Sequence, residues 1–257
     1  TNHRPAGTPI RGFGGVSQGP GPLADLIQSI QETLDPLVGK PLSVTAIVDI
    51  MNKVGVCVVS GNVRRTAEIA FGDPESEEYI DLKDYSKHPE RGAYGWTSNN
   101  SVLATLGMDY TKVCERVRTN GEPGFAWLQN MREYGRMGSE RDHRDIHALG
   151  GNPCLEQTLE SFEMCCLVET FPNRHKSLED YLETLSMSGL AQFVAARDLS
   201  TLKKWCEKGY QKVQDTDREI SARLGVPRSI KTTSIKPSGT VSLLAGATPG
   251  MRTTSLF

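Results

Sequence analysis

Long apolar runs are absent from this sequence, and neither sign of charge is in clear excess. Nowhere do about eighteen apolar residues follow one another, which excludes an obvious membrane-spanning helix. Lysine and arginine number 29 against 31 aspartates and glutamates, so the formal net charge is only −2. This balance gives no electrostatic reason to expect a nucleic-acid or membrane partner, and it favours chemistry on small molecules.

Cysteine is scarce, and reliable metal-ligand spacings are missing. Six cysteines among 257 residues are too few for a disulfide scaffold. The opening "TNHRPAGTPIRGFGG" lacks the charged and apolar regions of a secretion signal. We therefore expect a soluble, cytoplasmic protein whose cysteines are thiols. We predict no metal site, because the cysteines form no C-x-x-C pair and "DHRDIH" (residues 142–147) is interpreted as a solvated charged segment.

The length of the chain suits one large domain. At 257 residues it can bury a substantial core as one large α/β domain or as two smaller ones, and we expect a single domain over residues 1–257. The chain opens on a loop rich in glycine and proline and has no initiator methionine. We therefore expect a fragment of something longer.

Helical and strand-like segments alternate along the sequence. Apolar residues recur at helical spacing in residues 23–34, 44–59 (behind a Ser43 cap), 108–120 and 177–223. Short apolar segments predict strands at residues 67–71, 101–106 and 125–130, and a helix is predicted to begin within 74–85. After residue 229 a β-branched run leads into a Pro-Ser-Gly turn. Such alternation predicts a parallel α/β architecture.

Asn152, Cys154 and Glu156 are the candidate reactive residues. Pro153 disfavours a helix around them, so we expect residues 152–156 to be extended or a loop. In an extended chain alternate side chains share a face, which would bring the amide, the thiol and the carboxylate into one pocket. The thiol, or a species derived from it, could then attack while the carboxylate takes a proton and the amide orients a hydroxyl.

A structural interpretation competes with this chemical one. Cysteine is among the residue types most often buried, so Cys154 could be a packed, inert thiol with Glu156 at the surface. Cys165 and Cys166 are sequence neighbours whose Cα atoms lie about 3.8 Å apart, too close for the usual disulfide geometry. The remaining cysteines fall in helical patterns and are predicted to be core thiols: Cys57, Cys114 and Cys206.

A longer match goes beyond these local patterns. The segment "GGNPCLEQTLESFEMCCLVETFPN" closely resembles the active-site finger loop of ribonucleotide reductases, specifically the monomeric, adenosylcobalamin-dependent ribonucleoside-triphosphate reductases. Further segments resemble other parts of that family: "RPAGTPIRGFGG", "GNVRRTAEIAFGDPESEEYIDLKDY", "GWTSNNSV", "GEPGF" and "SIKPSGTVSLLAGATPG". The similarity covers nearly the whole chain, and the segments follow the family's order.

The resemblance implies both a fold and a reaction. The fold would be part of the ten-stranded α/β barrel of the family, with an interior finger loop carrying Cys154. Adenosylcobalamin would generate a thiyl radical at Cys154, which abstracts the 3′-hydrogen of a ribonucleoside triphosphate. Glu156 would accept the proton of the 3′-hydroxyl, and Asn152 would hydrogen-bond the sugar hydroxyls. Cys165 would be half of the reducing dithiol, recharged by thioredoxin or a similar reductant, and a deoxynucleotide effector would act on the full-length protein.

Substrate contacts are predicted at further positions. The candidates are Arg4, Gly7, Ser98, Pro237, Ser238, Gly239 and Thr240. The last four offer backbone N–H groups and hydroxyls to a phosphate, and the resemblance favours a phosphate loop where the pattern alone favours an ordinary turn. The alternative for Arg4 and Gly7 is a flexible terminus.

Two departures from the family pattern stand out. "LEDYLETL" runs directly into "SMSGLAQF", which suggests an internal deletion near residues 185–186, and residues 252–257 form an atypical tail. Removing part of a closed barrel exposes strand edges, so we predict that this fragment alone is inactive. Two alternatives stay open: a non-catalytic remnant that binds at most nucleotide phosphates, and a reductase of another class with a different radical source.

Overall fold

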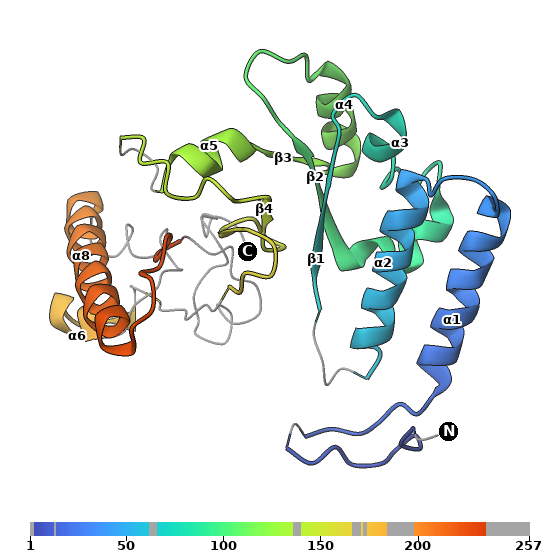
Figure 1. Cartoon of the computed structure of the whole chain (residues 1–257), viewed down its shortest axis with the longest axis horizontal. Coiled ribbons are helices and arrows are strands. Elements are labelled where there is room, and N and C mark those ends of the chain that lie inside the picture. Colours follow the sequence, from blue (N-terminus) through green and yellow to red (C-terminus); the bar gives the residue numbers. More distant parts are fainter. Residues whose placement is uncertain are drawn as a thin grey trace. The chain divides into compact units, whose positions relative to one another are not determined.

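The computed structural model describes residues 3–12, 14–61, 66–135, 140–165, 171, 174–183 and 198–234 (Figure 1). The chain divides into two compact units, Thr1–Leu128 and Gln129–Phe257, and each is considered by itself. The expected single catalytic domain therefore stays a prediction. The expected deletion and tail lie outside the described residues.

The first unit begins with two packed helices, α1 (Gly21–Leu34) and α2 (Val44–Val59), joined through the short 3-10 helix η1 (Asp35–Leu37). The predicted cap of the second helix is confirmed, because the Ser43 side chain accepts a hydrogen bond from the Ala46 N–H at 3.1 Å. Lys53 joins the helices by donating to the Thr33 hydroxyl at 2.6 Å. Both helices that the apolar spacing predicted are therefore present, and they pack against each other.

A parallel sheet of three strands follows, in the order β1 (Glu68–Gly72), β2 (Ser98–Leu103) and β3 (Gly124–Ala126). Both strand pairs are parallel, which confirms the predicted architecture. The connections contain α3 (Glu77–Ile80), η2 (Pro89–Ala93), η3 (Gly95–Thr97) and α4 (Thr111–Asn120). The strand predicted over residues 125–130 is largely wrong, because α5 (Leu128–Glu133) takes its second half.

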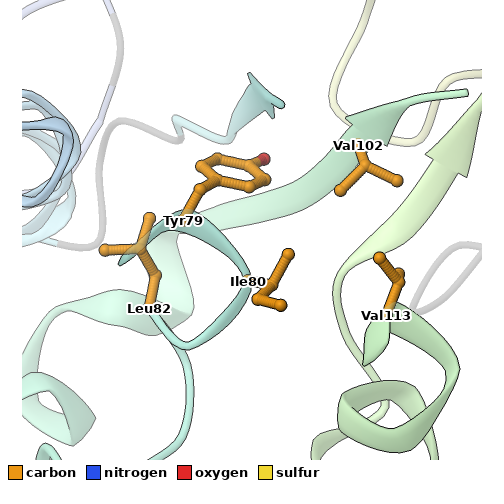
Figure 2. Packing of buried hydrophobic residues seen from close by; sticks show 5 residues of the cluster. All are labelled: Tyr79, Ile80, Leu82, Val102 and Val113. Carbon is orange, nitrogen blue, oxygen red and sulfur yellow. The ribbon is translucent and has the colours of Figure 1, made fainter. Parts of the chain in front are cut away.

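The core of this unit lies between the sheet and its connections. Its buried members are Tyr79, Ile80, Leu82, Val102 and Val113, shown together in Figure 2. The hydroxyl of Tyr79 lies 2.6 Å from the Ala70 carbonyl oxygen and accepts from the Ser101 N–H at 3.0 Å. The buried Tyr79 side chain thus joins β1 and β2, the two neighbouring strands that hold Ala70 and Ser101.

Within its described residues, the second unit contains most of α5, a small antiparallel hairpin and two further helices. The strands are β4 (Gly150–Gly151) and β5 (Thr158–Leu159), and the helices are α6 (Leu178–Glu183) and α8 (Leu199–Leu224). Tyr181, Leu202 and Trp205 form the buried cluster between the two helices, which were predicted from periodicity. Among the described residues, no helix combines the length and the apolar character needed to cross a membrane.

Candidate active site

Cys154 lies in the loop of a tight hairpin, here called the finger hairpin (residues 149–159). Gly150 pairs with Leu159 and Gly151 with Thr158. Beyond these pairs, the Asn152 N–H donates to the Gln157 carbonyl at 3.0 Å. The four residues between them, 153–156, form the loop that reverses the chain.

The loop is a turn and not an extended strand. The Leu155 N–H donates to the Asn152 carbonyl at 2.8 Å, and Leu155 has a φ of 59° in the left-handed region. The prediction of a loop is therefore confirmed, whereas the argument from alternating side chains was wrong, because alternation requires extended backbone. The three candidate residues come from one turn instead of from one face of a strand.

The environments of the three residues differ. Asn152 is buried with 8% of its surface exposed, Cys154 is exposed, and Glu156 is half-buried. The alternative interpretation of Cys154 as a packed thiol is therefore wrong, and its chemical role stays a prediction. Atom Oε2 of Glu156 is buried, so the carboxylate does not simply extend into solvent as that interpretation supposed. The turn presents the thiol outward and keeps the amide and the carboxylate nearer the protein.

The side chain of Asn152 braces the turn. Its Oδ1 accepts a hydrogen bond from the Gln157 N–H at 3.0 Å, which closes the loop from the other side. This bond fixes the plane of the carboxamide and leaves the NH₂ group as the donor that a ligand hydroxyl could use. Asn152 therefore stabilises the hairpin through its Oδ1 atom and offers its NH₂ group as a donor suited to a sugar hydroxyl.

Cys165 lies in a cleft of about 240 Å³ within the second unit. Thr158 of the hairpin, Asp145 and Lys231 line the same cleft. Cys165 is half-buried, and its predicted role in the reducing dithiol stays a prediction. Its neighbour Cys166 lies outside the described residues.

Lys231 and Asp145 are the residues that sequence reasoning missed. The Lys231 ammonium lies 2.5 Å from the Asp145 carboxylate, and their side chains are 15% and 5% exposed. The interpretation of "DHRDIH" as a solvated segment was wrong for Asp145, because this carboxylate is buried against a cation. The pair lies 86 residues apart in sequence, so no local pattern signals it.

The other predicted site residues are distributed over the chain. Ser98 is buried, and its hydroxyl exchanges hydrogen bonds with Asn52 and lies 3.0 Å from Asn100 Oδ1, so it belongs to an internal polar network. Arg4 and Gly7 lie in a loop that the Gly7 N–H closes by donating to the Ser17 carbonyl at 2.8 Å. That bond counts against the flexible-terminus interpretation. The substrate roles of all three stay predictions.

The phosphate-loop candidates Pro237, Ser238, Gly239 and Thr240 lie outside the described residues. Of the predicted core thiols, Cys206 packs against the cluster of the second unit, and Cys57 is half-buried. The prediction was wrong for Cys114, which is exposed on α4. Within the described part of the chain, no group of three or more His, Cys, Asp or Glu side chains could hold a metal ion.

We predict that Gly151→Ala loosens the finger hairpin. A Cβ at position 151 would lie 2.4 Å from the Gln157 carbonyl oxygen, and this backbone atom cannot move without parting the two strands. Because the same oxygen accepts from the Asn152 N–H, we expect protection of that amide from hydrogen exchange to fall about tenfold or more. Gly92→Ala, at an exposed glycine with open space around it, is the control. Equal protection in both variants would contradict the prediction.

Known proteins resemble the chain over almost its whole length, although no family model matches it. A probable adenosylcobalamin-dependent ribonucleoside-triphosphate reductase of Dictyostelium discoideum is 55% identical over 281 residues, covering 96% of this chain and 37% of the relative. The adenosylcobalamin-dependent ribonucleoside-triphosphate reductase of Euglena gracilis is 52% identical, covering 96% and 38%. That of Levilactobacillus brevis is 33% identical, covering 96% and 41%.

A solved structure agrees with these relatives. The crystal structure of a B12-dependent (class II) ribonucleotide reductase matches with a TM-score of 0.81 and 28% identity, over 97% of this chain and 42% of that chain. This chain therefore spans about two fifths of the length of the proteins it matches. The span matched in the Dictyostelium protein, 281 residues, exceeds the 257 residues of this chain, so it includes positions without a counterpart here.

Proposed function

The chain belongs to the adenosylcobalamin-dependent ribonucleotide reductases, and from that premise we propose that its Cys154 is the thiol at which the whole protein reduces ribonucleoside triphosphates. Its fold is that of part of the α/β barrel of this family. The observation that carries the proposal is the finger hairpin, in which one turn holds an exposed thiol, a braced amide and a half-buried carboxylate. The product would be the 2′-deoxyribonucleoside triphosphate.

Each residue of the hairpin has a distinct task in this proposal. The Cys154 sulfur, as a thiyl radical, takes the hydrogen atom from C3′ of the ribose and returns a hydrogen atom at the end of the cycle. This exchange is reversible because S–H and ribose C–H bonds are of comparable strength. The rate therefore depends on how closely the Cys154 sulfur is positioned and oriented toward C3′. Glu156 accepts the proton of the 3′-hydroxyl, and the NH₂ group of Asn152 orients the sugar by donating to a hydroxyl oxygen.

The reduction needs two electrons and two protons from a dithiol. The 2′-hydroxyl leaves as water, and the dithiol becomes a disulfide, with Cys165 as one of its two sulfurs. The half-buried position of Cys165 in the cleft supports this role. For the whole protein we propose thioredoxin or a similar dithiol as the reductant and a deoxynucleotide as the effector. We also propose a cytoplasmic location, because six cysteines in 257 residues are too few for the disulfide scaffold typical of secreted proteins.

Adenosylcobalamin is the cofactor that we propose for the whole protein. When bound, it supplies the radical that removes the hydrogen atom from the Cys154 thiol. The described residues fit such a group because Cys154 is exposed in the loop of the hairpin, where a large cofactor has access to its sulfur. Cys154 is therefore the residue of this chain on which the cofactor would act.

The proposal is tested in a full-length reductase that contains this chain. The chain replaces the matching region of the Dictyostelium relative, which keeps its own residues wherever this chain has no counterpart. We expect this chimaera to convert ribonucleoside triphosphates to deoxyribonucleotides when adenosylcobalamin and a dithiol are both supplied, and omission of the cofactor should reduce product formation to background. The unaltered relative is the control. A folded chimaera that forms no product, or forms it equally well without cofactor, would contradict the proposal.

A further inference from the structure

A largely buried cation lies at the base of the finger hairpin. The Lys231 ammonium donates to the Met131 carbonyl at 2.8 Å, to the Asp145 carboxylate at 2.5 Å, and to the Thr158 hydroxyl. The Thr158 hydroxyl in turn donates to Asp145. The three hydrogens of the ammonium thus have three acceptors, which is the full capacity of this group.

These contacts join segments that are far apart in sequence. Met131 belongs to α5, Asp145 precedes β4, Thr158 lies in β5, and Lys231 follows α8. All of them belong to the second unit, so their arrangement does not depend on how the units are placed. The charge of one lysine therefore fixes the hairpin strand to the rest of its unit.

The position of Thr158 makes this attachment relevant to the thiol. Thr158 pairs with Gly151, which directly precedes the turn formed by Asn152 and the three residues after it. The hairpin is a single pair of strands with only two paired positions, too few to hold its direction without support from the rest of the unit. A displacement of Thr158 would consequently tilt the whole turn that carries Cys154.

We propose that Lys231 is a positioning residue, which through Asp145 and Thr158 sets the direction in which the finger hairpin presents Cys154. The inference rests on the proposed function and adds a residue to it. Lys231 acts on Cys154 through the hairpin, because its ammonium donates to Met131, Asp145 and Thr158. Removing it should misplace the thiol, and a misplacement of about 1 Å can lower a rate about a hundredfold.

The variants must separate positioning from simple unfolding. Lys231→Met leaves the buried Asp145 carboxylate without its cation, which destabilises a fold strongly. The double variant Lys231→Met with Asp145→Asn removes both charges and avoids that penalty. Thr158→Val removes only the hydroxyl that links the pair to the hairpin. Lys212→Met, at an exposed lysine of α8, is the matched control.

Hydrogen exchange on the chain itself is the first measurement. The Asn152 and Leu149 amides donate to the carbonyls of Gln157 and Leu159, respectively. We expect their protection from exchange to fall at least about tenfold in the double variant and in Thr158→Val. Amides in the middle of α8 and the control variant should keep their protection. If the protection of these two amides from hydrogen exchange stays within twofold of the parent in both test variants, the inference is overturned, whatever the activity of the whole protein.

Kinetics in the chimaera is the second measurement. We expect kcat of the double variant to fall about 30- to 100-fold while KM changes less than about threefold, because the reacting thiol and not the binding of substrate is displaced. Lys231→Arg, which keeps the charge and the donors, should recover most of kcat. An unchanged kcat in a variant with a loosened hairpin would overturn the positioning role. An inactive parent chimaera would instead count against the proposed function, and the exchange measurement would still decide the inference.

Discussion

Cys154→Ser in the full-length chimaera should abolish deoxyribonucleotide formation, with a loss on the order of a thousandfold or more. Serine is nearly the same size and would occupy the exposed turn without disturbing the hairpin. The loss would be chemical, because an O–H bond is much stronger than an S–H bond and its hydrogen atom cannot be exchanged reversibly with the ribose. Steady-state turnover with cofactor and dithiol, measured beside hydrogen exchange of the hairpin amides, would separate chemistry from structure.

Cys114→Ser provides the matched control. It makes the same chemical change at another exposed cysteine, which lies on α4 in the first unit. We expect this variant to turn over like its parent. A Cys154→Ser variant that retains more than a few per cent of parental activity would show that the radical resides elsewhere.

Gly72→Ala should destabilise the first unit more than any other glycine-to-alanine change discussed above. A Cβ at this position would lie 2.3 Å from Cγ of the Tyr79 ring and 2.4 Å from two further ring atoms. The ring cannot withdraw easily, because it is 2% exposed and its hydroxyl accepts from the Ser101 N–H while lying 2.6 Å from the Ala70 carbonyl oxygen. Burial raises the pKa of this hydroxyl above its usual value, so it remains a neutral donor.

Overpacking of this kind costs about 1 to 3 kcal/mol or more, because the ring or the strand must move. In a chain of this size each kcal/mol lowers the midpoint of thermal unfolding by about 2 to 4 °C, so we expect a decrease of about 2 to 12 °C. Circular dichroism melts of the whole chain would measure it. Gly92→Ala, with no atom within 4 Å of the added carbon, should melt with the parent. A midpoint of thermal unfolding for Gly72→Ala within about 1 °C of that of the parent would refute this account of the core.

Local signals in the sequence account for most of the fold. The Ser43 cap and the apolar spacing behind it place α2 almost to the residue. The strand β1 follows from a short apolar segment that ends in a Gly-Asp-Pro turn. The error over residues 125–130 was avoidable, because "LQNMRE" consists mainly of good helix formers and forms α5.

The geometry of the candidate site could not be predicted from the sequence, and the roles of its residues stay predictions. "GGNP" holds residue types that favour turns, and it signals the reversal that the finger hairpin makes at Asn152. The left-handed conformation of Leu155 has no such signal, because leucine rarely adopts it and only the surrounding bonds impose it. The ion pair of Asp145 with Lys231 depends on tertiary folding, which places together two residues that no local rule relates.

The long sequence separation of that ion pair also has a consequence during synthesis. Lys231 is added to the chain 73 residues after Thr158. At about 5 to 20 residues per second, the ribosome would complete the hairpin roughly 4 to 15 seconds before the lysine exists. Asp145 must stay hydrated for that interval, because a carboxylate without a cation is costly to bury. The finger hairpin therefore gains this attachment only after residue 231 has been added, and a nascent chain that stalls before that point would carry Cys154 on a hairpin that lacks its contact with the lysine.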